Sequence, residues 1–169
     1  MRVWIFFGQS GAGKSFVGRV CAEELGFQHY DGDRDLTPEM LGALREHRVF
    51  TEDMRTEFVA VLSRGIHERV TQNAQSPRPN PGLAVSQGLF KTRARDQLRR
   101  DFPNARLVWV RASEELLETR LQQRRGHAAS NAYARFVNGG FEEPAPGGDV
   151  LENDGDRARV VDQLKACLR

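Results

Sequence analysis

The sequence predicts an α/β fold in which a mainly parallel, five-stranded sheet lies between helices. Two observations lead to this fold class. Short apolar runs alternate along the chain with longer segments whose apolar residues recur at helical spacing. The first apolar run, residues 3–7, is continuous, which is typical of a strand covered on both faces. The 169 residues correspond to about one domain.

In the first half of the chain, apolar spacing and glycine delimit the expected elements. A helical period starts at Lys14 and is stopped by Gly26, and a short second strand covers residues 27–30. Residues 37–47 are weakly helical. Residues 53–70 are strongly helical, because their apolar side chains fall on one stripe: Phe58, Val59, Leu62, Ile66 and Val70.

Prolines and a helix cap delimit the elements of the second half. Residues 71–82 carry three prolines and are expected to form a loop, since the strand-like residues 83–86 follow at once. Residues 89–101 are helical in pattern, and residues 106–110 form the next strand. Ser113 caps a further helix with an acidic first turn. The remaining elements are a loop, a short strand and a closing helix, at residues 138–148, 150–151 and 156–168.

Charge and composition exclude several classes of protein. The chain has 25 Lys and Arg against 23 Asp and Glu, and a net charge of +2 indicates neither a nucleic-acid nor a membrane-surface protein. No apolar run approaches the ~18 residues of a membrane span. Cys21 and Cys167 lack a paired spacing, so reduced thiols and a cytoplasmic location are expected. The histidines show no metal-ligand spacing.

A glycine-rich motif follows the first expected strand, Gly8-Gln9-Ser10-Gly11-Ala12-Gly13-Lys14-Ser15. Two glycines separated by four residues and followed by Lys and Ser are typical of a phosphate-binding loop, or P-loop. Gly11 and Gly13 permit backbone angles that turn the N–H groups of the loop toward an anion. Lys14 can reach the β- and γ-phosphates of a nucleotide, and the Ser15 hydroxyl can bind Mg²⁺. The expected fold is therefore a three-layer P-loop NTPase fold, although the motif does not separate kinase, GTPase and ATPase.

Two carboxylates, Asp31 and Asp33, follow the second expected strand. Groups beyond the carboxyl ends of parallel strands face the ligand crevice, so both should lie near the phosphates. One can hold Mg²⁺ through water, and the other can accept a proton from an attacking hydroxyl. The alternative is an ordinary Asp-Gly turn. No acidic residue directly follows residues 83–85 or 106–110, which favours a small kinase over an ATPase motor or a GTPase.

Two groups of basic residues lie on expected helices. Arg120 and Arg124 share one helix face, where they can stack on a base and contact phosphates as the segment closes. The alternative is a solvated helix end that complements the helix dipole. The second group is interleaved with acidic residues and is interpreted as a solvated helix face: Lys91, Arg93, Arg95, Arg99 and Arg100.

Together these residues resemble the gluconate kinase family, within the shikimate-kinase-like group of P-loop small-molecule kinases. The resemblance extends over most of the chain and rests on the P-loop, on Asp31-Gly32-Asp33 and on Arg55 downstream. It continues through Phe90-Lys91, Arg95-Asp96-Gln97-Leu98-Arg99, Arg120-Leu121, Arg124, Gly126-His127, Phe136 and Glu143-Pro144.

The resemblance implies one kinase domain over residues 1–169, with a helical lid at about 113–140, that transfers the ATP γ-phosphate to a hydroxyl of a sugar acid. It implies that Asp31 and Ser15 serve Mg²⁺, and that Lys14, Asp33 and Arg124 are catalytic. Arg55 would hold an acceptor carboxylate, with Asp33 and Lys91 also at the acceptor, and Arg120 would stack on adenine. The implied nucleotide-binding residues are Gly8, Gly11, Ala12, Gly13, Lys14, Ser15, Phe16, Arg120 and Arg124. A monomer or a homodimer is expected.

The acceptor side departs from the family's pattern, while the nucleotide side is intact. This chain has Leu36-Thr37 where the family usually has His-Pro. It has Met40 and Ala43 at the positions of the family's Asn and Lys. Further departures are Gly88 for Ser, Ala128-Ala129 for an aromatic pair and Ala134-Arg135 for Ser-Gln.

Three functions therefore compete. The first is an ATP- and Mg²⁺-dependent kinase of a small, anionic alcohol. The second is a nucleotide-binding module with a decayed acceptor site that acts through partner proteins. The third is a shikimate-type kinase or a kinase of a nucleotide or nucleic-acid end, against which the near-zero net charge and the lack of interleaved aromatic residues argue.

Overall fold

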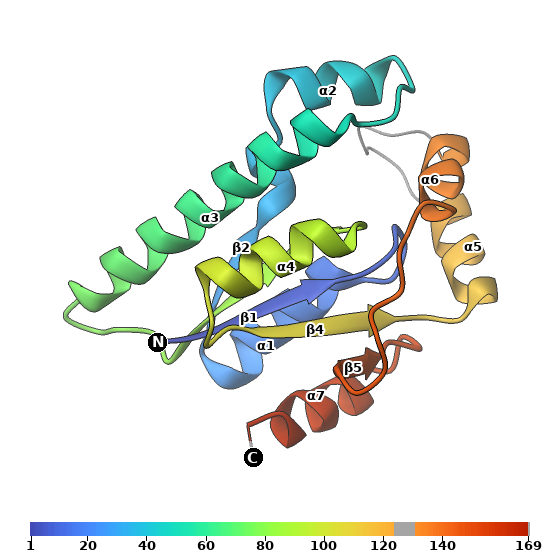
Figure 1. Ribbon diagram of the computed structural model, residues 1–169. Helices are drawn as coiled ribbons and strands as arrows, with labels where there is room; N and C mark the ends of the chain where they lie inside the picture. The colour runs from blue at the N-terminus through green and yellow to red at the C-terminus, as the bar shows by residue number, and fades with distance from the viewer. Residues whose placement is uncertain (124–130, 169) are drawn as a thin grey trace.

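Five parallel strands form one sheet in a computed structural model, which describes residues 1–123 and 131–168 (Figure 1). The strand order is β2-β3-β1-β4-β5, and every neighbouring pair is parallel. The strands are β1 (Arg2–Phe7), β2 (Gln28–Asp31), β3 (Gly82–Ser86), β4 (Arg106–Arg111) and β5 (Asp149–Glu152). The predicted fold class is confirmed, and the carboxyl ends of all strands meet at one edge of the sheet.

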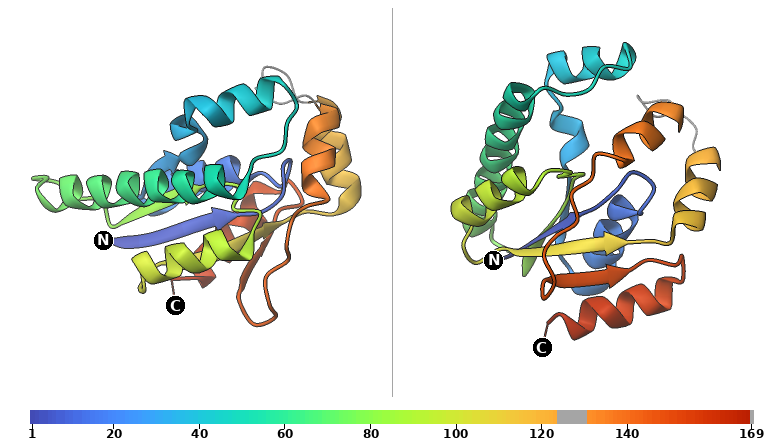
Figure 2. Two further views of the ribbon diagram at one scale, coloured as in Figure 1. Left: turned by 45° about the horizontal axis from the view of Figure 1, so that its top comes forward. Right: turned by 45° about the vertical axis from the view of Figure 1, so that its right-hand side comes forward.

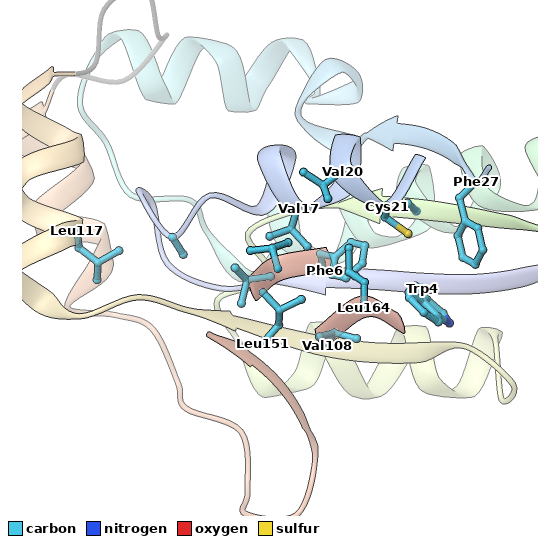
Figure 3. Close-up of a cluster of buried hydrophobic side chains, with 14 residues drawn as sticks. Trp4, Phe6, Val17, Val20, Cys21, Phe27, Val108, Leu117, Leu151 and Leu164 are labelled. Carbon is cyan, nitrogen blue, oxygen red and sulfur yellow. The ribbon is translucent and has the colours of Figure 1, made fainter. Parts of the chain in front are cut away.

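Helices cover both faces of the sheet. One face carries α1 (Lys14–Leu25) and α7 (Arg157–Ala166), and the other carries α3 (Glu52–Ala74) and α4 (Thr92–Asp101), as the views in Figure 2 show. Residues of β1 alternate between the two faces. Trp4 and Phe6 pack with α1 and α7 (Figure 3), whereas Ile5 and Phe7 pack with α3 and α4. This double burial is the physical reason for the continuous apolar run in the sequence.

Three further helices and a 3₁₀ turn lie beyond the carboxyl end of the sheet. They are η1 (Gly32–Asp35), α2 (Pro38–Arg45), α5 (Glu114–Gln123) and α6 (Asn131–Asn138). A small apolar cluster joins α2 to the start of α3, through Met40, Ala43, Met54 and Phe58. Helices α5 and α6 pack against each other on the opposite side (Figure 2). The hydroxyl of Tyr133 on α6 donates a hydrogen bond to the carbonyl of Arg48, 2.6 Å away, and so links the two sides.

Two element boundaries differ from the sequence prediction. Helix α3 continues to Ala74, past the expected loop start at residue 71, because the first residue that blocks a helix is Pro77. Helix α4 begins at Thr92 rather than at 89, because Leu89 has a left-handed φ of 46° that no α-helix accommodates. Gly26 ends α1 with a φ of 69°, as predicted.

Both cysteines are free thiols, as expected. Cys21 is buried, and burial is the main reason that its pKa rises to about 12. Cys167 is half-buried against the same core. Among the described residues, no helix is both long enough and apolar enough to cross a membrane.

Candidate functional site

The P-loop joins β1 to α1, and its glycines have backbone angles that other residues rarely adopt. Gly8, Gly11 and Gly13 have φ values of 152°, 90° and 88°. A Cβ atom on Gly8 would lie 2.4 Å from the carbonyl oxygen of Val110. On Gly13 it would lie 2.2 Å from Nδ2 of Asn153. The loop therefore needs glycine at both ends, and it leads directly into the positive N-terminus of α1.

Lys14 and Ser15 open α1 beside Asp31, which ends β2. The Nζ atom of Lys14 donates a hydrogen bond to the carbonyl of Gln9, 2.8 Å away, so its ammonium group lies back across the loop. The Ser15 hydroxyl donates to Oδ2 of Asp31 at 3.3 Å. The structure thus brings together Ser15 and Asp31, which the sequence analysis assigned to one metal site.

This pair of oxygen ligands fits a Mg²⁺ ion. Mg²⁺ in nucleotide sites takes one or two protein oxygens and completes its shell with phosphate oxygens and water. Ser15 and Asp31 supply a hydroxyl and a carboxylate at the loop that would hold those phosphates. The part of the chain that the structure describes has no cluster of three or more His, Cys, Asp or Glu residues for a metal.

Asp33 begins a short hydrogen-bonded chain across the ends of two strands. Its backbone N–H donates to Oδ1 of Asp31 at 3.1 Å. Its own carboxylate oxygen Oδ1 accepts a hydrogen bond from Nε2 of Gln87, 3.0 Å away. Gln87 follows β3 and is buried, and its Oε1 accepts from the N–H of Gly88. Gln87 therefore fixes the position of the Asp33 carboxylate.

Arg120 on α5 lies against the P-loop. Its guanidinium donates hydrogen bonds to the carbonyls of Gly11, Ala12 and Asn153, over 3.3, 3.4 and 3.0 Å. Asn153, which is 2% exposed, also donates from Nδ2 to the carbonyl of Ala12 at 2.8 Å. Burial lowers the pKa of Arg120 from its ordinary value. Arg124, predicted to reach the phosphates, lies outside the described residues.

A cavity of about 800 Å³ opens beside the P-loop. It gathers the predicted phosphate and acceptor residues: Lys14, Asp33, Arg55 and Lys91. Arg55 forms an ion pair with Glu52 at 2.7 Å, and Lys91 pairs with Glu142 at 3.1 Å. Ala12 and Phe16 differ from the other predicted residues, because their side chains pack in or against the apolar core below α1.

Arg95 corrects one prediction, because it does not belong to a solvated helix face. It is 1% exposed, and it donates to the carbonyls of Leu89, Phe90 and Glu142 at 2.8, 3.3 and 2.6 Å. Its guanidinium also lies 5.0 Å from the ring centre of Phe7. Arg95 thereby holds the turn that carries Lys91 against the segment after α6. Arg93, Arg99 and Arg100 are exposed, as predicted.

Sequence reasoning missed three amides at this site: Gln87, Asn138 and Asn153. Gln87 follows β3 and Asn153 follows β5, so the rule that ligand-facing residues follow parallel strands could have found both. Asn138 ends α6, where no comparable signal exists. Its side chain bonds to the backbone of Ser10 in the P-loop.

Comparisons with known proteins agree with this geometry. A family profile described as an AAA domain matches residues 3–138. The thermosensitive gluconokinase of Escherichia coli (strain K12) is 26% identical over 169 residues, which cover 98% of this chain and 86% of that protein. The shikimate kinase of Chlorobaculum parvum (strain DSM 263 / NCIMB 8327) is 32% identical over 120 residues, 69% of this chain but 57% of that protein.

Solved structures extend this similarity to three dimensions. A gluconokinase structure from Sinorhizobium meliloti 1021 superposes with a TM-score of 0.77 at 26% identity, covering 99% of this chain and 91% of that one. The predicted resemblance to gluconokinases and shikimate kinases is confirmed, and it supports a kinase of a small molecule. Given the profile match over residues 3–138 and the P-loop geometry, the chain belongs to the AAA domain family.

Proposed function

We propose that this protein is an ATP- and Mg²⁺-dependent kinase that transfers the γ-phosphate to a hydroxyl group of a small, anionic acceptor related to sugar acids. One observation carries the proposal: Lys14 of the P-loop, Asp33, and the cations Arg55 and Lys91 line the same cavity. A nucleotide phosphate, a reacting hydroxyl and an acid group of the acceptor would each have a partner there. The similarity to gluconokinases supports this substrate class.

In the proposed reaction, the acceptor hydroxyl oxygen attacks the γ-phosphorus, the bond from that phosphorus to the β,γ-bridging oxygen breaks, and ADP leaves. Asp33, held by Gln87, orients the hydroxyl and accepts its proton. Lys14 and the N–H groups of the loop stabilise the negative charge on the transferred group. When bound to Ser15 and Asp31, Mg²⁺ would neutralise part of the phosphate charge.

The proposal includes residues 113–140 as a lid over the nucleotide. Arg120 connects α5 to the P-loop carbonyls and would bind the nucleotide from that side, with Arg124 as its partner. The side chain of Asn138 attaches the end of α6 to the same loop. Closure of such a segment would exclude water and so favour transfer to the acceptor over hydrolysis.

The test is release of ADP from Mg-ATP across a panel of gluconate, shikimate, 2-hydroxyhexanoate, 6-hydroxyhexanoate, glucose and adenosine. We expect an acidic acceptor to stimulate the release and Lys14→Ala to abolish it. Lys165→Ala, on the exposed side of α7, is the matched control and should behave as the wild type. ATP binding without ADP release for every acidic acceptor would contradict the proposal and favour a nucleotide-binding module.

A further inference from the structure

An apolar wall makes up a large part of the lining of the cavity. Side chains from η1, α2, the 49–50 turn, α3 and α6 contribute to it: Leu36, Met40, Leu41, Leu44, Val49, Phe50, Phe58, Phe136 and Val137. The charged and amide groups of the cavity come instead from the P-loop, the ends of the strands, and the starts of α3 and α4. The cavity therefore combines a few polar groups with a larger apolar surface.

The apolar wall is a preformed surface. Met40 and Phe58 are 2% and 5% exposed and belong to the cluster that joins α2 to α3. Phe136 and Val49 also line the cavity and are 65% and 53% exposed, so they extend this apolar surface to the solvent. A ligand with its own apolar surface would cover these side chains and remove them from water.

A polyhydroxylated ligand fits this wall poorly. Each hydroxyl that leaves water needs a hydrogen-bond partner, or its desolvation goes uncompensated. Among the described residues of this wall, Tyr133 carries a hydroxyl group, and it donates a hydrogen bond to the carbonyl of Arg48, 2.6 Å away. The amide of Gln87 is likewise engaged, with Asp33 and with Gly88.

The cationic groups fix where an acid group of the ligand would bind. Arg55 and Lys91 line both the large cavity and an adjoining recess of about 250 Å³ between α3 and α4. Arg93 and Arg100 line that recess as well. A carboxylate at the shared wall would compete with Glu52 and Glu142 for Arg55 and Lys91.

From this division of the cavity we infer that the acceptor is an amphipathic hydroxy acid. Its carboxylate binds at Arg55 and Lys91, its hydroxyl at Asp33, and its hydrocarbon body of several carbons along the wall formed by α2 and α6. The inference rests on the proposed kinase function for the role of the hydroxyl, but the preference in binding can be measured without turnover.

The test compares ligands of equal chain length by calorimetric titration of the full chain loaded with a non-hydrolysable ATP analogue and Mg²⁺. Gluconate, 2-hydroxyhexanoate and 6-hydroxyhexanoate share six carbons and a carboxylate. Gluconate carries a hydroxyl on each of its remaining carbons, whereas each hexanoate carries one hydroxyl, at C2 or at C6. We expect the better of the two monohydroxy acids to bind at least tenfold more tightly than gluconate. When the chain of the better monohydroxy acid is lengthened, its affinity should rise about fourfold per added methylene until the wall is covered. Equal or tighter binding of gluconate, or a flat series, would overturn the inference.

Two variants test whether the apolar wall causes the preference for monohydroxy acids over gluconate. Leu36→Asn and Phe136→Ala should each weaken binding of the monohydroxy acids about fivefold and leave gluconate within twofold. Neither side chain is fully buried, so both variants should fold, which unchanged binding of the ATP analogue checks. Val150→Thr, an exposed apolar position on β5, is the matched control. Loss of affinity that is equal for gluconate and the monohydroxy acids would also overturn the inference.

The same ligands separate the two proposals. Binding that favours the monohydroxy acids, without ADP release for any acidic acceptor, would uphold the inference about the cavity and remove the kinase function. ADP release that is efficient with gluconate and weak with both hexanoates, together with tighter binding of gluconate, would uphold the kinase function and remove the inference.

Discussion

Asn138 and Ser10, 128 residues apart in the chain, exchange two hydrogen bonds. The Ser10 N–H donates to Oδ1 of Asn138 at 2.8 Å, and Nδ2 of Asn138 donates to the Ser10 carbonyl at 3.0 Å. The end of α6 is thereby attached to the P-loop. Ser10 also lines the large cavity, so this amide pair lies where the proposed nucleotide and acceptor sites meet.

Replacing Asn138 tests this attachment. In Asn138→Asp, the carboxylate can still accept from the Ser10 N–H, but it cannot donate to the carbonyl, and it places a negative charge beside the phosphate site. We expect the Kd for Mg-ATP to rise about tenfold or more in Asn138→Asp and only a few-fold in Asn138→Ala. Asn104→Asp, in an exposed turn, controls for the added charge. Equal Kd values in the two Asn138 variants would contradict a position near the phosphates.

Alanine substitutions at two glycines, one in the P-loop and one in α2, test whether the P-loop requires glycine. Gly13 has a φ of 88°, and a Cβ added there would lie 2.2 Å from Nδ2 of Asn153. Gly13→Ala should therefore lower the free energy of unfolding by about 1–3 kcal/mol. Gly42 lies in α2 with nothing within 4 Å of its added Cβ. Gly42→Ala should therefore raise the free energy of unfolding by about 0.5–1 kcal/mol. Urea unfolding measures both, and a loss at Gly42 as large as that at Gly13 would refute the steric argument.

Arg95 should be the most sensitive basic residue of α4. Arg95→Met removes the donor that three buried or half-buried carbonyls share, and should lower the free energy of unfolding by about 2–4 kcal/mol. Arg99→Met removes an exposed ion pair with Asp96. It is the matched control and should change the free energy of unfolding by less than about 0.5 kcal/mol. Similar losses in the two variants would mean that burial of Arg95 contributes little.

The carboxylate of Glu142 should contribute to the stability of the fold in a pH-dependent way. Hydrogen bonds from the Thr92 N–H and from Lys91 lower its pKa from 4.5 to about 2. Because the folded-state pKa is depressed, the stabilisation is present above pH 4.5 and is lost as the pH falls toward 2. The side chain is about half exposed, so solvent screening limits the effect to about 1 kcal/mol or less.

Chemical unfolding of the wild type and Glu142→Gln between pH 7 and pH 2.5 measures this contribution. The wild type should be the more stable protein at neutral pH, and the difference should shrink below pH 4.5. A difference that stays constant or grows in acid would show that Glu142 acts through something other than its charge.

Local signals predicted most of the fold and the glycine-rich turn of the P-loop. The apolar run of β1, the stop at Gly26 and the glycine spacing of the P-loop each depend on a few neighbouring residues, which sequence patterns record. Arg95 shows the limit of such reasoning. Its neighbours Asp96 and Arg99 are typical of a solvated helix, and only the packing of Phe7 and of the segment after α6 buries it.

The proposed acceptor side of the site could be predicted only in part. Asp33, Arg55 and Lys91 carry a recognisable pattern, and they line one cavity. The apolar wall opposite them combines Leu36, Phe58 and Phe136, which are far apart in the chain. Their meeting depends on how α2, α3 and α6 pack, and helical periodicity alone does not show which faces will meet across a cavity.

The most direct test of the account is ³¹P NMR of the products formed from Mg-ATP and an acidic acceptor by the wild type and by Asp33→Asn. We expect the wild type to produce ADP and a phosphomonoester, and Asp33→Asn to form the ester ~10²–10⁴-fold more slowly while its ATP affinity changes less than about threefold. Asp162→Asn, exposed on α7, should match the wild type. Orthophosphate as the sole product of the wild type, or normal ester formation by Asp33→Asn, would contradict the account.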